Sequence, residues 1–94
     1  MERIKVAVKE ETNWAGNRYL IYSTEEHGKI AELDYPHDGR NARVYALNIS
    51  DNDYISFSSV PSAMVGAETA VKGYLLDRGI YGVEFKYPRT IRIR

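Results

Sequence analysis

The apolar residues of this 94-residue chain change their spacing twice, and that change constrains its fold more than any other feature. From residue 3 to residue 58, apolar side chains recur at every second position, as in Ile4, Val6 and Val8, which is typical of half-buried strands. After Ser59 they recur at helical spacing, and beyond Gly79 the period of two returns. The order therefore predicts several strands, one helix, and then one or two strands.

Turn residues divide the periodic segments from one another. Gly, Pro, Asn and Asp cluster between them, where they supply the backbone conformations of turns. The helix is expected to begin behind a Ser59 cap with Pro61 in its first turn, and to end at Gly79. The predicted strands are residues 3–10, 18–23, 29–35, 43–49, 54–58, 80–87 and 90–94, and the predicted helix is residues 61–78.

These elements predict a single α+β domain over residues 1–94, in which a mainly antiparallel sheet of about five or six strands forms one layer and the helix the other. The chain length supports one core, because two cores from 94 residues would each be too small. A helix of about 16 residues is ~24 Å long, enough to cover one face of a twisted sheet. A partly closed barrel with the helix as a plug is the alternative architecture.

The composition excludes several classes of protein. The chain has no cysteine, which excludes disulfides, cysteine-ligated zinc and a thiol nucleophile. Its 13 Lys and Arg are balanced by 13 Asp and Glu, which argues against a wholly basic coat and against an acidic DNA mimic. No apolar run approaches the roughly 18–20 residues of a membrane span. We therefore expect a soluble, cytoplasmic protein with no membrane partner.

The residue types that catalyse reactions or bind metals are scattered. Both imidazoles, His27 and His37, fall in predicted turns and are expected to be solvated. A metal site built on either histidine would lack the paired histidines or cysteines that such sites use. Gly66 and Gly73 lie inside the predicted helix, so no glycine-rich phosphate loop is formed. We therefore expect a protein that is not an enzyme and that binds no metal and no cofactor.

Cations near both ends of the sequence are predicted to point to solvent. If Ile4, Val6 and Val8 face the core, the side chains between them face outward, and the same holds around Ile91 and Ile93. Should the two terminal strands pair, Arg3, Lys5, Lys9, Arg92 and Arg94 would share one sheet face. Such a face suits a phosphate backbone and makes nucleic-acid binding the alternative function. Ordinary solvated alternation explains the same pattern without a ligand.

Tyrosine is unusually frequent, with 8 tyrosines against 2 phenylalanines. Its ring is apolar and its hydroxyl polar, so tyrosine serves both sheet packing and wet protein interfaces. Their phase assigns Tyr45, Tyr74 and Tyr87 to the core. Trp14, in a polar loop, fits either a lid on the core or an interface anchor. The predicted partner-binding residues are Trp14, Arg18, Tyr22, Tyr54 and Tyr81.

The predicted helix carries small residues on the side away from its apolar stripe. Two glycines inside a helix cost about 1 kcal/mol each relative to alanine, so a close backbone approach by another element is one explanation for them. A homodimer through this side is one hypothesis, and chance glycines in a tolerant surface helix are the other. The residues of the predicted dimer face are Gly66, Thr69, Gly73 and Leu76.

The absence of a catalytic set, together with interface aromatics and cations, predicts a non-catalytic module that binds a protein partner as an inhibitor or adaptor. The chain is similar in kind to small inhibitors encoded by phages or plasmids, which is an analogy of size and composition only. Nucleic-acid binding through the basic strands remains the alternative.

Overall fold

Five strands, one helix and a sixth strand follow one another along the chain, which confirms the predicted α+β order. The computed structural model describes residues 3–12, 14–35, 41–48 and 54–88, and the predicted strand at 90–94 lies outside them. The elements are β1 (Arg3–Thr12), β2 (Arg18–Thr24), β3 (Gly28–Tyr35), β4 (Ala42–Ala46), β5 (Ile55–Phe57), α1 (Val60–Leu76) and β6 (Gly82–Lys86).

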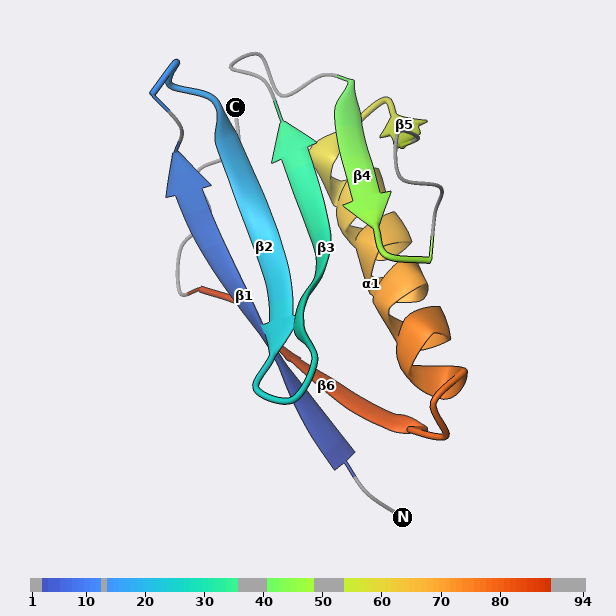
Figure 1. Cartoon of the computed structure of the whole chain (residues 1–94). Helices are drawn as coiled ribbons and strands as arrows, with labels where there is room; N and C mark the ends of the chain where they lie inside the picture. The colour runs from blue at the N-terminus through green and yellow to red at the C-terminus, as the bar shows by residue number, and fades with distance from the viewer. Residues whose placement is uncertain (1–2, 13, 36–40, 49–53, 89–94) are drawn as a thin grey trace.

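The six strands form one sheet in the order β5-β4-β3-β2-β1-β6. The first five make an antiparallel meander, whereas β6 pairs with β1 in parallel, from Arg3 opposite Gly82 to Ala7 opposite Lys86. A parallel pair needs a long crossover, and α1 lies within it (Figure 1). The sheet is therefore mainly antiparallel, as predicted, with one parallel edge.

The helix α1 lies on one face of the sheet, over the half made by β3, β4 and β5 (Figure 1). Its buried residues include Ala67, Val71 and Leu75, which recur at helical spacing. They join a core to which Leu33 and Val44 of the sheet contribute completely buried side chains. Their spacing and burial explain why this segment is a helix in the fold.

The inner face of the other half of the sheet is packed by aromatic rings. Tyr22 of β2 is completely buried, and its ring makes edge contacts with Phe85 and Tyr87 at centroid distances of 6.1 and 6.0 Å. The hydroxyls of Tyr22 and Tyr87 are hydrogen-bonded at 2.9 Å, and the Tyr87 hydroxyl donates to Glu68 of α1. The prediction that Tyr22 contacts a partner is therefore wrong, because its ring and hydroxyl are both used inside the chain.

Both ends of α1 are capped as the sequence predicts. The Ser59 side chain accepts a hydrogen bond from the Ser62 backbone N–H at 3.3 Å. At the other end Gly79 has a φ of 80°, and the Arg78 Nη1 donates to the Tyr74 carbonyl at 3.0 Å. No helix in the described part of the chain combines the length and the apolar character that crossing a membrane requires.

Two strands depart from the alternation that the sequence predicts. The register of β2 and β3 shifts between Tyr22 and Ser23, so the successive residues Ile30 and Ala31 are both buried. In β4, Val44 is completely buried against the helix layer, and its neighbour Tyr45 therefore points to the opposite face. Assigning Tyr45 to the core was wrong, whereas Tyr74 and Tyr87 do pack against it.

The close approach suggested by the two helix glycines is made within the chain. A Cβ at Gly66 would stand 2.2 Å from the Cζ of Phe57 in β5. A Cβ at Gly73 would meet only the Nδ2 of Asn48, at 3.5 Å, and that amide donates to the Ala70 carbonyl. Gly66 is therefore needed for the packing of β5 on α1, which corrects its assignment to a contact with a second copy.

Alanine substitutions at these two glycines are expected to have opposite effects on stability. Gly66→Ala must displace the Phe57 ring, and overpacking of this kind costs about 1–3 kcal/mol, more than the roughly 1 kcal/mol gained in helix propensity. Gly73→Ala has room and should gain about 0.5–1 kcal/mol. Urea denaturation of both variants measures the difference, and equal stability of the two would contradict the packing described here.

Candidate functional site

The sheet face turned away from α1, called the outer face below, carries the polar side chains of the strands. Strand registers arrange them in rows across the sheet, because directly paired residues lie on the same face. In one row Tyr19 of β2 pairs with Asp34 of β3, which pairs with Arg43 of β4. None of the described elements packs on this face, so its side chains are the first place to look for a binding site.

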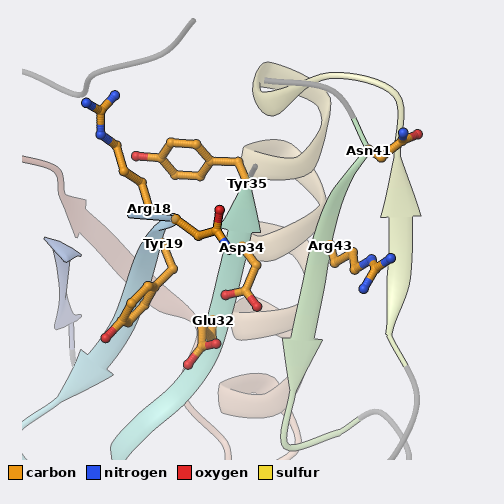
Figure 2. Close-up of a pocket in the computed structure, with 8 residues that line it drawn as sticks. Arg18, Tyr19, Glu32, Asp34, Tyr35, Asn41 and Arg43 are labelled. Carbon is orange, nitrogen blue, oxygen red and sulfur yellow. The ribbon is translucent and has the colours of Figure 1, made fainter. Parts of the chain in front are cut away.

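A groove of about 600 Å³ follows this row at the end of the sheet where β2 begins and β3 ends. Figure 2 shows Tyr19, Glu32 and Asp34 next to one another on β2 and β3, with Arg43 on the neighbouring strand. The groove, called the Asp34 groove below, is lined by Asn17, Arg18, Tyr19, Glu32, Asp34, Tyr35, Asn41 and Arg43.

Asp34 is the most strongly perturbed group in this groove. Its Oδ1 is buried and has no hydrogen-bond partner among the described residues. Burial, together with the hydrogen bond and the negative charge of Glu32, raises the pKa of Asp34 to about 7. Burial also opposes ionisation of Glu32, but its hydrogen bonds with Asp34 and Lys29 outweigh that effect and lower its pKa. Below about pH 7 the proton of the pair therefore lies on Asp34 rather than on Glu32.

Arg43 lies directly opposite Asp34 in the register but does not neutralise it. Its guanidinium stands 4.7 Å from the ring centroid of Tyr54, and that ring packs on Tyr45 at 5.4 Å. The side chain extends away from Asp34 in Figure 2, and the two form no ion pair in the described chain. A cation–π contact at an exposed site contributes about 0.5–1 kcal/mol, enough to favour this arrangement.

The arrangement offers acid–base or ionic chemistry. A carboxyl that titrates near neutrality is able to exchange a proton with a ligand or to bind a cationic group once ionised. Within the described ranges, no set of three or more His, Cys, Asp or Glu side chains is placed to hold a metal ion.

A second groove, called the β1 groove below, lies on the same face beside β1. Arg3, Lys5 and Lys9 are exposed on the outer face of β1, as the alternation predicts, and Lys86 joins them from β6. Arg92 and Arg94, the other two predicted cations, lie outside the described residues. The lining of this groove consists of Arg3, Ile4, Lys5, Ala7, Lys9, Ser23, Thr24, Glu25, Glu26 and Lys86.

The remaining predicted partner-binding residues are dispersed over the surface. Trp14 is 98% exposed in the β1–β2 turn, and Arg18 lines the Asp34 groove that begins beside this turn. Tyr54 is 42% exposed, and its ring contacts the guanidinium of Arg43, which is the β4 member of the row that includes Asp34. Tyr81 is 70% exposed but precedes β6, where the chain meets the start of β1 at the opposite end of the sheet. Arg18 therefore lines the Asp34 groove and Tyr54 contacts Arg43 of its lining, whereas Trp14 and Tyr81 do not line it.

Sequence reasoning missed Glu32, Asp34 and Arg43 as site residues. They occupy the outward phase of predicted strands, where charged side chains are ordinary. The usable signal was two acids at alternate positions of one strand, Glu32 and Asp34, which must point to the same face. Their proximity to Arg43 depends on the register between strands, which the sequence does not state directly.

His27 and the predicted dimer-face residues of α1 lie outside both grooves. His27, predicted to be solvated, is half-buried, with its ring edge-on to Tyr74 at 6.0 Å, and His37 lies outside the described residues. Thr69 and Leu76 are exposed on α1, so a second copy docking through them stays a prediction.

No family model, no curated protein and no solved structure matches this chain.

The raised pKa of Asp34 predicts a measurable pH dependence of stability. An aspartate in the unfolded chain has a pKa near 3.9, so the folded state binds this proton more tightly. Its contribution is fully present below about pH 4 and is lost as the pH rises through about 7. Asp34→Asn should remove this loss, which is on the order of 1 kcal/mol after discounting for solvent screening at a half-exposed group.

Chemical denaturation between pH 4 and pH 8 tests this expectation. The matched control is Glu25→Gln, which removes an exposed carboxyl in the β2–β3 turn. If Asp34→Asn keeps the same pH slope as the parent and the control, Asp34 does not hold a proton in the folded state.

Proposed function

We propose that this protein is a non-catalytic binding module that recognises a protein partner through the outer face of its sheet, in the manner of an inhibitor or adaptor. The observation that carries the proposal is the Asp34 groove, in which the buried Oδ1 of Asp34 has no hydrogen-bond partner among the described residues and no described element covers the sheet face. Burying a polar atom without a hydrogen bond is costly, and a partner that supplies a donor would remove that cost.

The groove has the make-up of a protein interface around it. Such interfaces combine a few large aromatic or arginine side chains with surrounding polar groups. Trp14 is almost completely exposed, although burying a large aromatic side chain is strongly favourable. The side chains of Tyr54 and Arg43 are already held in contact with each other. Covering them with a partner would therefore cost less side-chain conformational entropy. These three residues and Arg18 are the proposed anchors.

Protein is favoured over nucleic acid because the outer face carries charges of both signs. Glu32 and Asp34 occupy the middle of the face, where a phosphate backbone would be repelled when both are ionised. A protein surface is able to match alternating charges group by group. Nucleic-acid binding is therefore kept as an outcome of the test.

The carboxyl pair also has the acid–base character of some catalytic sites, but structural networks of charged groups perturb pKa values in the same way. We also propose that the module works in the cytoplasm. Small domains of oxidising compartments are often held together by disulfides, and this chain has no cysteine to form one.

The proposal is tested by affinity capture from the native host with matched variants. The immobilised protein is compared with Trp14→Ala/Tyr54→Ala, which truncates two anchors, and with Val65→Ala/Leu76→Ala, which truncates two exposed apolar side chains of α1. A captured protein is then purified and titrated. The anchor variant is expected to lose at least about 2 kcal/mol of binding, roughly 30-fold in Kd, while the helix variant binds like the parent.

Two outcomes would overturn this proposal. Equal loss in the helix variant would move the interface to α1. A gel shift with nucleic acid at low salt, in the absence of any protein that depends on Trp14 and Tyr54, would favour the alternative function.

A further inference from the structure

The β1 groove has a centre and a regular surround. The small side chain of Ala7 forms the bottom of the groove at its centre. Two residues away on either side along β1, and on the same face, are Lys5 and Lys9. Across the sheet, Ala7 pairs with Lys86 on one side and with Ser23 on the other. A rise of about 3.4 Å per residue puts the Cα atoms of Lys5 and Lys9 roughly 14 Å apart. The strand spacing of about 4.8 Å separates the Cα atom of Lys86 from that of Ala7.

Three of the four cations that line this groove make no ion pair with a described residue, although Glu84 lies opposite Lys5 in the register. Lys86 is paired with Glu84 at 2.9 Å, whereas Arg3, Lys5 and Lys9 have no ion pair with any residue that the structure describes. The pKa of Glu84 shows the effect of these cations. The hydrogen bond and ion pair of Glu84 with Lys86 lower that pKa, and the positive charges of Arg3 and Lys5 lower it further. A carboxylate is thus already stabilised at the edge of the groove.

We infer that the β1 groove binds an extended acidic segment of the protein partner, with carboxylates opposite Lys5 and Lys9 and a small residue over Ala7. The inference rests on the proposed function and names the chemistry of the partner. An extended peptide repeats its side-chain direction every two residues, as β1 does, so carboxylates four residues apart match the spacing of the two lysines. The complementary charge is supplied by Arg3, Lys5, Lys9 and Lys86 of the lining.

The groove fits a carboxylate peptide better than a nucleic acid. Single-strand-binding surfaces use aromatic rings as stacking platforms, and the described lining of this groove contains none. Glu25 and Glu26 at its rim, together with Glu84, would repel a continuous row of phosphates. A peptide carries charge only at its acidic residues, so it places fewer negative charges beside these three carboxylates, although Glu84 lies opposite Lys5 in the register.

The inference is tested with synthetic probes, so it does not depend on identifying the partner. The probes are a fluorescently labelled short peptide with Asp at every fourth residue, Ala midway between successive Asp residues and Thr elsewhere, its counterpart with Asn in place of Asp, and a single-stranded oligonucleotide of equal charge. Binding is followed by anisotropy at low and moderate salt. The acidic peptide is expected to bind the parent protein, more weakly as salt increases, and the uncharged peptide is not.

Three variants locate the binding. Lys5→Glu/Lys9→Glu reverses the two central cations and should weaken the acidic peptide at least about tenfold. Ala7→Glu removes no cation but places a carboxylate at the centre of the groove, and should have a similar effect. Lys72→Glu is the matched control, because Lys72 is an exposed cation of α1 in the other layer, and should change the affinity less than twofold. Circular dichroism checks that each variant is folded.

Other results would overturn the inference. Absence of binding by the parent at low salt, equal binding by the variants, or tighter binding of the oligonucleotide through the same lysines would each do so. Failure here would leave the capture experiment untouched, because that experiment depends on Trp14 and Tyr54. Conversely, peptide binding without a Trp14-dependent partner would show an acidic-peptide groove and refute the proposed anchors.

Discussion

One helix has to cover one face of a six-stranded sheet, and most of the architecture follows from that shortage. A helix is about 10–12 Å across and strands are about 4.8 Å apart, so one helix covers two or three strands. Accordingly α1 packs on β3, β4 and β5. The uncovered strands bury their inner face beneath Phe85 and Tyr87, and the Tyr87 hydroxyl joins Tyr22 to Glu68.

This division of labour between the two faces determines where recognition chemistry is found. The inner face takes nearly all of the completely buried apolar side chains of the sheet, and no element in the described part of the chain forms a second layer on the outer face. Side chains on the outer face have to be polar enough for solubility, but they do not have to fit into a packed core. An unfavourable arrangement such as Asp34 beside Glu32 is therefore tolerated on that face. Local conflicts of this kind tend to mark functional positions, because a stable fold keeps few of them elsewhere.

The sequence predicted the elements well and the relations between them less well. Periodicity and caps located α1 between Ser59 and Gly79, since those signals are local. The completely buried Tyr22 was misplaced because its strand has apolar or aromatic side chains in both phases, and only the fold decides which phase is inward. The Asp34 groove needed the registers of three strands, and the role of Gly66 needed the position of Phe57 in another element. Such pairings are set by distant residues, so a local pattern carries little information about them.

The pairing of β1 with β6 has a consequence for how the molecule is made. Arg3 pairs with Gly82 and Ala7 with Lys86, so the first described strand meets its last neighbour only after nearly all of the described chain has been synthesised. Until then one border of β1 exposes unpaired backbone groups, which favours association between nascent chains. The charged side chains of Arg3, Lys5 and Lys9 lie along that border, and their mutual repulsion would keep two unfinished copies apart on neighbouring ribosomes.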